Sequence, residues 1–576
     1  MKKILLSLSV IIFSVVPLFA QKIIKGIVKD ETGETLPGST IFVKGTGSSA
    51  LADANGEFSV QAAKEVPFTV TVNLVGYKTQ DVEVYEVTDE ALEVTLQLDN
   101  VLNEVVVVGY GEQKRKDITG SVASVPTELK ALPVSSPERL LQGSIAGVLV
   151  TQTTGQPGGV VSIQVRGNNS ITAGSDPLYV VDGFPINNDY SLVDAGVTDG
   201  AKLNPLSFLS PTDIENIDVL KDASATAIYG SRGANGVVMI TTKKGVHSKA
   251  ATVNYTGYYG VQDVIRTIPV LNARQWWELR KDAYANTPNG KAPTLPAASN
   301  FKYDTIGAGT DWQRAAFTQA LTQNHNLSIN AGSDKTSLAF SGNYFSQDGV
   351  LRNTGFKRYA ARVNIDHEVN DRFRINAFLT GSFTKGEVAP SAIVPNLLLT
   401  SPAIPIYDTL GNFVRNTSTD SPLQNPINSL LNQINESLTT RILANVSGEY
   451  RIIEGLTAKI LIGSDLVFNK QNRYLPNTTY EGNPSGGIGT GGIATVGTLN
   501  TSSWLNENTL NYNKIINGKH NINVVAGFTA QAAKSTGVIA SAGTFAFDDL
   551  TYNALQNGTG SRTPSSSQNA WQLASF

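Results

Sequence analysis

The sequence predicts a mainly β protein: an N-terminal β-sandwich, a second domain of α+β type and an incomplete transmembrane antiparallel β-barrel. From about residue 250, apolar and polar residues alternate with a period of two, as where Phe373, Ile375 and Ala377 alternate with Arg374 and Asn376. No apolar run after residue 20 is long enough to cross a bilayer as a helix, so a membrane-spanning part must consist of strands. The alternation gives each strand one face for lipid and one for a wet lumen.

Residues 1–20 have the layout of a secretory signal peptide, with Lys2 and Lys3 before an apolar run that ends at Ala20. The chain has no cysteine, which excludes disulfides and thiolate metal sites. With a net charge of -3, the chain lacks the excess of basic residues that is typical of nucleic-acid-binding proteins. The four histidines are widely separated, and no catalytic set stands out. We therefore expect an exported protein that is not an enzyme and has no metal or cofactor.

Residues 21–99 contain short alternating runs separated by turn signals, which is typical of a small β-sandwich. The predicted strands lie at 25–29, 39–43, 58–60 and 68–73. The motifs 30–33, 36–38, 55–58 and 75–77 resemble the carboxypeptidase regulatory-like domain, which has no peptidase chemistry of its own.

Residues 112–246 mix short strands with one or two short helices. Ser210 and Pro211 predict a helix start, 217–220 a strand and 222–229 a short alanine-rich helix. The glycine-rich run 230–236 follows that helix and precedes a strand at 237–241. A phosphate-binding loop requires the opposite order, so a nucleotide site is excluded.

Residues 250–576 show a strict alternation of short and long connections, as periplasmic turns and external loops require. Short turns are predicted near 332–335, 370–371, 454–455 and 517–518, and long connections at 263–322, 347–356, 385–438, 469–502 and beyond 531. We count about nine strands, with a tenth starting at Gln572, whereas plugged outer-membrane barrels have about 22. Because an open barrel leaves an unpaired edge in lipid, the chain is expected to be the N-terminal part of a longer protein or a truncated, non-transporting product.

Several motifs of the second domain resemble those of a known protein family. The runs 141–143, 145–148, 155–158, 162–167 and 176–185 resemble the plug of a TonB-dependent outer-membrane transporter. The longer runs 220–238 and 241–245 resemble the SusC/RagA family more narrowly, and the resemblance covers essentially the whole chain after the signal peptide.

The resemblance implies an energised importer in the outer membrane, embedded in outer-membrane lipids. Its substrate would be an oligosaccharide or a peptide, and a SusD-like lipoprotein would cover the barrel. TonB, driven by its inner-membrane motor, would pull on a TonB box in the linker 100–111. Four consecutive valines favour an extended backbone there, to which a partner strand can pair. The predicted box comprises Glu104, Val105, Val106, Val107, Val108, Gly109, Tyr110 and Gly111.

Three charged residues of the plug, Arg166, Asp182 and Arg232, are candidates for ion pairs between plug and barrel wall; ordinary folding contacts within the plug are an equal alternative. A signal-transducing receptor is an alternative function, although the sandwich pattern of residues 22–98 differs from the α/β layout of a signalling domain. A surface adhesin is disfavoured, because an adhesin needs neither a plug nor a tethered strand.

Overall fold

The computed structural model describes residues 23–31, 33–44, 46, 48–62, 66–74, 77, 79–86, 91–97, 105–108, 111–114, 122–126, 134–167, 175–186, 190–247, 250–286, 307–415, 424–484, 491–516 and 520–575. The predicted signal peptide, Glu104, Gly109, Tyr110 and the predicted turn at 517–518 lie outside these residues. The chain divides into two compact units that separate within the segment 106–119.

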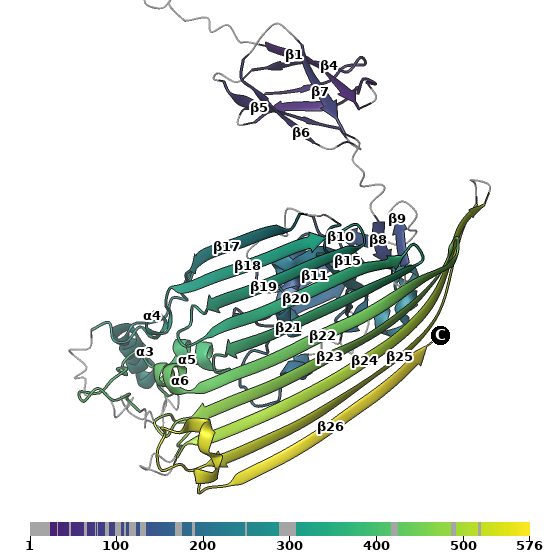
Figure 1. Ribbon diagram of the computed structural model, residues 1–576. Helices are drawn as coiled ribbons and strands as arrows, with labels where there is room; N and C mark the ends of the chain where they lie inside the picture. The colour runs from purple at the N-terminus through teal and green to yellow at the C-terminus, as the bar shows by residue number, and fades with distance from the viewer. Residues whose placement is uncertain are drawn as a thin grey trace, which may run out of the picture. The chain divides into compact units, whose positions relative to one another are not determined.

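The first unit contains a β-sandwich of seven strands (Figure 1). One sheet has the order β4-β1-β7 and the other β3-β2-β5-β6. Alternate residues of these strands point between the sheets; Val28, Ile41, Val70 and Leu96 are fully buried. The predicted sandwich is confirmed, and its strands are β1 (Ile23–Asp30), β2 (Thr40–Val43), β3 (Ser49–Leu51), β4 (Glu57–Gln61), β5 (Phe68–Asn73), β6 (Gln80–Val84) and β7 (Leu92–Leu96).

The second unit contains the plug, built on a mixed sheet of order β10-β15-β16-β13-β14. Its strands are β10 (Val122–Ser124), β13 (Leu178–Val181), β14 (Phe184–Ile186), β15 (Ile214–Leu220) and β16 (Val237–Thr242). A separate antiparallel pair consists of β11 (Val148–Gln152) and β12 (Val161–Val165).

Short helices connect the plug strands. They are η4 (Pro137–Leu141), η5 (Tyr190–Val193), η6 (Pro205–Phe208), η7 (Pro211–Asp213), α2 (Ala223–Thr226) and η8 (Ala227–Gly233). The helix predicted to start at Ser210 is only a three-residue 3-10 turn, because strand β15 begins directly after it at Ile214. The helix predicted at 222–229 is divided between α2 and η8.

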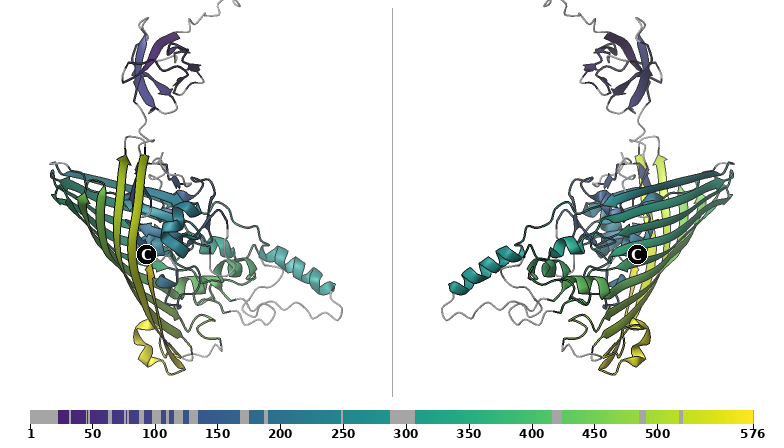
Figure 2. Two further views of the ribbon diagram at one scale, coloured as in Figure 1. Left: turned by 90° about the vertical axis from the view of Figure 1, so that its right-hand side faces the viewer. Right: turned by 90° about the vertical axis from the view of Figure 1, so that its left-hand side faces the viewer.

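The second unit also contains a curved antiparallel sheet of ten strands in chain order, a partial β-barrel. The plug lies on its concave side (Figure 2). Its strands are β17 (Thr252–Gln262), β18 (Ala320–Gly332), β19 (Thr336–Asp348), β20 (Gly355–Asn370), β21 (Phe373–Glu387), β22 (Ile434–Ile453), β23 (Leu456–Leu475), β24 (Ile493–Ile516), β25 (His520–Gly543) and β26 (Arg562–Ser575).

Two details of the predicted barrel are wrong. The tenth strand begins at Arg562 rather than at Gln572. Strands β23 and β24 extend beyond their predicted ends, so that the connection placed at 469–502 runs only from 476 to 492, and β25 continues past residue 531 to Gly543. Both errors arise where Ser, Thr, Asn and Gly line both faces of a strand, because such a strand has no contrast between apolar and polar positions.

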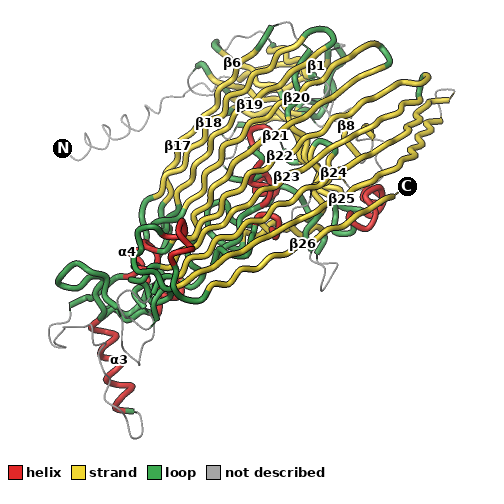
Figure 3. The backbone as a smooth tube through the Cα atoms, turned by 60° about the horizontal axis from the view of Figure 1, so that its bottom comes forward, coloured by secondary structure: helices red, strands yellow, loops and turns green. Residues whose placement is uncertain are grey.

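Helices occupy the long connections at one end of the large sheet, as α3 and α4 show in Figure 3. They are α3 (Ala273–Ala285), α4 (Trp312–Ala316), α5 (Ile393–Leu399), α6 (Pro426–Asn432) and η10 (Thr551–Asn557). Helices α4, α5 and α6 share a small core around Trp312, Leu397 and Ile427. Among the described residues, no helix has both the length and the apolar character needed to cross a bilayer.

The predicted two-faced character of the strands is clear in β20. Arg358, Arg362 and Asn364 are buried toward the plug, whereas Tyr359 and Ile365 on the opposite face are 50% and 40% exposed. The plug also packs apolar side chains on the concave face of the sheet, against Phe378, Leu443, Leu461 and Leu505. The interface between plug and sheet is therefore a hydrophobic core surrounded by buried polar groups.

Candidate functional site: the plug held against the sheet

The valine run of the predicted TonB box forms a strand, β8 (Val105–Val108). It pairs with β9 (Gly111–Lys114) in a two-stranded sheet. One edge of β8 is thus already engaged within the chain. A partner strand can reach β8 by adding to its second edge or by replacing β9.

Arg358 of β20 connects the sheet to three backbone carbonyls of the plug. Its Nη1 donates to the carbonyl oxygens of Ser135 at 2.8 Å, Ser207 at 2.9 Å and Leu209 at 3.1 Å. Its Nε and Nη2 donate to Oδ1 of Asn343 on the neighbouring strand. Because the side chain is fully buried, these acceptors replace the water that the guanidinium loses.

Arg441 of β22 holds the same turn of the plug from a second point. It forms a bidentate ion pair with Asp465 of β23, with Nε to Oδ1 at 2.9 Å and Nη2 to Oδ2 at 2.6 Å. Its Nη1 donates to the carbonyl of Pro205 at 2.9 Å, and its guanidinium lies 4.4 Å from the centre of the Phe208 ring. Both partners of this ion pair belong to the sheet. Asp465 therefore neutralises the charge of Arg441, whose Nη1 donates to the plug.

The plug turn that receives both arginines is shaped by its own sequence. Asn204 caps η6 by accepting from the backbone N–H of Leu206 at 2.8 Å, and Pro205 occupies the first helical position. A short 3-10 helix leaves several carbonyls without a partner inside the helix. The arginines of the sheet therefore bind carbonyls that the plug cannot satisfy internally.

Asp182, one of the three predicted contact residues, lies at the interface and reaches the sheet indirectly. Its carboxylate accepts from the backbone N–H and the hydroxyl of Thr242, at 2.9 and 2.7 Å. Arg362 of β20 donates to the same hydroxyl at 2.9 Å and to the Lys243 carbonyl at 2.7 Å. Burial raises the pKa of Asp182, and the bonds from Thr242 and the charge of Arg362 oppose that shift.

The other two predicted residues make different contacts from those expected. Arg166 forms its ion pair within the plug, with Asp222, and not with the barrel wall. Arg232 does reach the sheet, where it donates to the amide oxygen of Gln531 on β25, which is a neutral partner. Their role in bracing the plug remains a prediction.

Side-chain amides of the sheet hold a further plug segment, residues 195–199, through its backbone. Asn469 accepts from the N–H of Ala195 at 3.1 Å, and Gln471 from those of Val197 and Thr198 at 2.8 and 3.2 Å. Asn435 accepts from the N–H of Asp199 at 3.1 Å. These three amides lie on adjacent strands, β22 and β23, and position the segment along the lumen.

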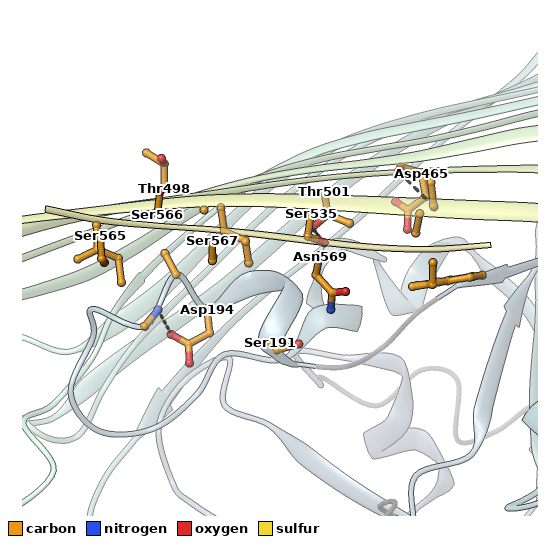
Figure 4. Close-up of a pocket in the computed structure, with 18 of the residues that line it drawn as sticks. Ser191, Asp194, Asp465, Thr498, Thr501, Ser535, Ser565, Ser566, Ser567 and Asn569 are labelled. Carbon is orange, nitrogen blue, oxygen red and sulfur yellow. Dashed lines mark hydrogen bonds between the residues drawn. The ribbon is translucent and has the colours of Figure 1, made fainter.

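A cavity of about 570 Å³ lies between this plug segment and strands β23–β26 (Figure 4). Its walls come from the plug at Ser191 and 194–196 and from the inner faces of the strands. The cavity has the size of typical ligand sites.

Arg358, Asn435 and Gln471 were not predicted as contact residues. Arg362 and Arg441 were not predicted as contact residues either. These contact residues could have been found in the sequence as arginine or amide side chains on the lumen side of an alternating strand. Such a side chain becomes buried when a plug fills the lumen, so it needs a hydrogen-bond partner there.

Two protein families match the chain by sequence. The TonB-dependent Receptor Plug Domain matches residues 114–237, and the CarboxypepD_reg-like domain matches residues 24–108.

Curated relatives extend the match along the chain. TonB-dependent receptor P3 of Formosa agariphila is 35% identical over 566 residues, which are 95% of this chain and 52% of the relative. TonB-dependent receptor SusC of Bacteroides thetaiotaomicron is 37% identical over 439 residues, which are 74% of this chain and 41% of the relative. The chain thus spans about half the length of the curated relatives it matches.

A solved structure of the RagAB peptide importer in its open-open state superposes with a TM-score of 0.67 at 27% identity. The superposition covers 82% of this chain and 53% of that one. The plug and the ten-stranded sheet therefore have counterparts in both sequence and fold.

Proposed function

This chain is a TonB-dependent receptor of the SusC/RagA type, and from that premise we propose that it acts in the import of oligosaccharides or peptides across the outer membrane. A SusD-like lipoprotein would capture the substrate with it, and TonB would supply the energy. The RagAB importer takes up peptides, which supports a large nutrient as cargo. The observation that carries the proposal is the plug packed on the concave face of a two-faced sheet.

In this mechanism the plug is the gate and β8 is the segment that transmits force. The contacts between sheet and plug are individual hydrogen bonds to backbone groups, such as those of Arg358 and Gln471. Each contributes on the order of 1–3 kcal/mol, so that they can break one after another as the plug is pulled. The apolar contacts with Phe378 and Leu443 return the plug to its place.

A backbone test of β8 distinguishes strand pairing from a requirement for valine side chains. Replacing Val105–Val108 by four threonines keeps β-branched residues and every N–H, whereas replacing Val106 and Val108 by proline removes two donors. We expect the threonine variant to retain uptake and the proline variant to lose it. Both variants should insert into the outer membrane and bind substrate as the unaltered protein does. Unchanged uptake by the proline variant would refute the assignment of the TonB box.

A further inference from the structure

Three neighbouring strands in the interior of the large sheet carry an ordered pattern of side chains on the face that points away from the plug. Strands β19, β20 and β21 pair in register, so residues opposite one another form rows across the sheet. The outermost row is Asp348, Gly355 and Glu387, the second is Ser346, Lys357 and Lys385, and the third is Tyr344, Tyr359 and Phe383. From the strand ends inward, the rows are therefore acidic, basic and aromatic.

The aromatic row marks one edge of the lipid-facing band. Its ring centroids lie 5.1 Å apart for Tyr344 and Tyr359 and 6.4 Å apart for Tyr359 and Phe383. Ten residues away along β21, Phe373 contacts the ring of Tyr450, and the outward positions between Phe373 and Phe383 carry no charged residue. At about 3.3 Å per residue and a tilt of about 40°, ten residues span about 25 Å in height, which is the apolar band of an outer-membrane barrel.

The basic and acidic rows lie beyond this band, at the height of lipid headgroups. They are at the end of the sheet where the long connections 263–319 and 388–433 lie, whereas the short turns 333–335, 371–372 and 454–455 are at the other end. External loops of such barrels are the long ones, so these rows face the external leaflet.

The two lysines of the basic row differ in their partners. Nζ of Lys385 forms ion pairs with Oε1 of Glu387 at 2.9 Å and with Oε2 of Glu436 at 3.2 Å. Lys357 is exposed, lies directly opposite Lys385, and forms no ion pair within the part of the chain that the structure describes. Like charges opposite each other on neighbouring strands destabilise a sheet, and an anionic group beside Lys357 would relieve this repulsion.

The acidic row has room for a cationic group. Asp348 is exposed, and its carboxylate has no partner among the described residues. Gly355 separates Asp348 from Glu387 without a side chain of its own; a Cβ there would lie 3.8 Å from Cα of Asp348 and 3.8 Å from Oε2 of Glu387. The row lies two residues beyond Lys357, about 7 Å along the strand.

We propose that these rows bind the phosphoethanolamine headgroup of a lipid in the external leaflet. Its phosphate accepts from Lys357, and its ammonium group, two carbons further from the acyl chains, donates to Asp348 and Glu387. The start of the acyl chains packs on the rings of Tyr359 and Phe383. A headgroup with a phosphate but no cation would leave the acidic row unmatched, and a trimethylated ammonium has no N–H to donate.

Native mass spectrometry of the full chain in detergent tests this assignment with dioleoyl phosphatidylethanolamine, phosphatidylglycerol and phosphatidylcholine. Phosphatidylethanolamine should bind about tenfold more tightly than the other two lipids. Lys357→Met should weaken the binding of phosphatidylethanolamine and phosphatidylglycerol about tenfold, and Lys357→Arg should retain it. Asp348→Asn should remove the preference for phosphatidylethanolamine over phosphatidylglycerol, because only the ammonium group contacts this carboxylate.

The large sheet offers matched controls. Lys470 lies at the same height on the outward face of β23, where Leu438 separates it from Lys385, and Asn472 rather than an acid follows two residues further on. Lys470→Met therefore controls for the loss of an exposed lysine. Asp371→Asn, in a short turn at the other end of the sheet, controls for the loss of an exposed carboxylate. Both variants should change lipid binding less than about twofold, since isolated exposed charges contribute little.

The assignment is overturned if the three lipids bind equally, if Lys357→Met and Lys470→Met have equal effects, or if Asp348→Asn keeps the preference of the unaltered chain. Soluble O-phosphoethanolamine distinguishes a lipid from a free headgroup. It should bind at least about a hundredfold more weakly than phosphatidylethanolamine, because it lacks acyl chains. Equal affinity would assign the rows to a soluble ligand and refute the lipid. None of these outcomes depends on what the chain imports, so the proposed function is tested separately.

Discussion

Glu138 of the plug gives a quantitative prediction of how plug stability depends on pH. Its side chain in η4 is 3% exposed, and Oε2 has no hydrogen-bond partner among the described residues. Burial raises the pKa of Glu138 from 4.5 to about 7, with a smaller contribution from the charge of Asp176; the neighbouring Asn204 and Ser136 oppose the shift. At about 1.36 kcal/mol per pKa unit, this shift corresponds to about 3 kcal/mol.

The sign of the effect follows from which state binds the proton more tightly. Below pH 4.5 the carboxyl is protonated in the folded and the unfolded plug, and burial carries no charge penalty. As the pH rises from 4.5 to about 7, the unfolded plug releases its proton first, so the free energy of unfolding decreases. Above this range the full destabilisation of about 3 kcal/mol is present.

Replacing Glu138 by Gln removes the titration while it conserves the shape of the side chain. We expect Glu138→Gln to stabilise the plug at pH 8 and to remove the part of the pH dependence between 5 and 8 that Glu138 contributes, whereas the part that comes from Asp182 remains. Hydrogen exchange of the amides of Leu140 and Leu141, corrected for the intrinsic pH dependence, measures this as protection up to roughly a hundredfold higher at pH 8. The exposed Glu215→Gln serves as the control. Identical pH profiles for the unaltered protein and Glu138→Gln would contradict the burial argument.

Two further substitutions test the contacts between plug and sheet. Arg441→Leu leaves Asp465 buried without its partner and should cost about 3–5 kcal/mol, which heat-modifiable gel mobility detects as a lower transition temperature. The double variant with Asp465→Leu should recover most of that loss, and a double variant as unstable as the single one would argue against a charge effect. Gly158→Val should loosen the plug, because its φ is +68° and its Cβ would lie 2.3 Å from Cδ2 of Phe356. Gly155→Val, with no heavy atom within 4 Å of its Cβ, should leave hydrogen exchange of β12 unchanged, and equal effects of the two valines would refute the steric reason.

The fold was predictable from the sequence wherever the two faces of a strand meet different surroundings. Strand β21 places Leu379 and Phe383 outward and Thr380 and Ser382 toward the plug. Apolar and polar residues therefore alternate clearly along its sequence. The predicted start of β26, residue 572, lies ten residues after the observed start at residue 562, because the run from Arg562 to Asn569 contains no large apolar residue and includes Pro564. Pairing with β25, a non-local interaction, determines the limits of that strand.

The site was less predictable, because the plug is held largely through its backbone. The acceptors of Arg358 are carbonyls of Ser135, Ser207 and Leu209, and a carbonyl carries no residue signature. Charged plug residues such as Arg166 were predicted as contact residues, because a charged side chain can be recognised from the sequence alone. The valines of β8 were recognisable as a strand for the opposite reason, since β-branching acts on the local backbone.

The two sheet arginines that hold η6 differ in what remains when the plug moves away. Arg441 keeps its charge partner, because Asp465 belongs to the sheet. Arg358 would keep the neutral amide of Asn343 and the ring of Phe345, 5.2 Å from its guanidinium, and would lose its three carbonyl acceptors. A guanidinium left with so few acceptors must recruit water or regain the plug. Displacement of the plug therefore costs more at Arg358 than at Arg441, and the same cost favours the return of the plug when the pulling force ends.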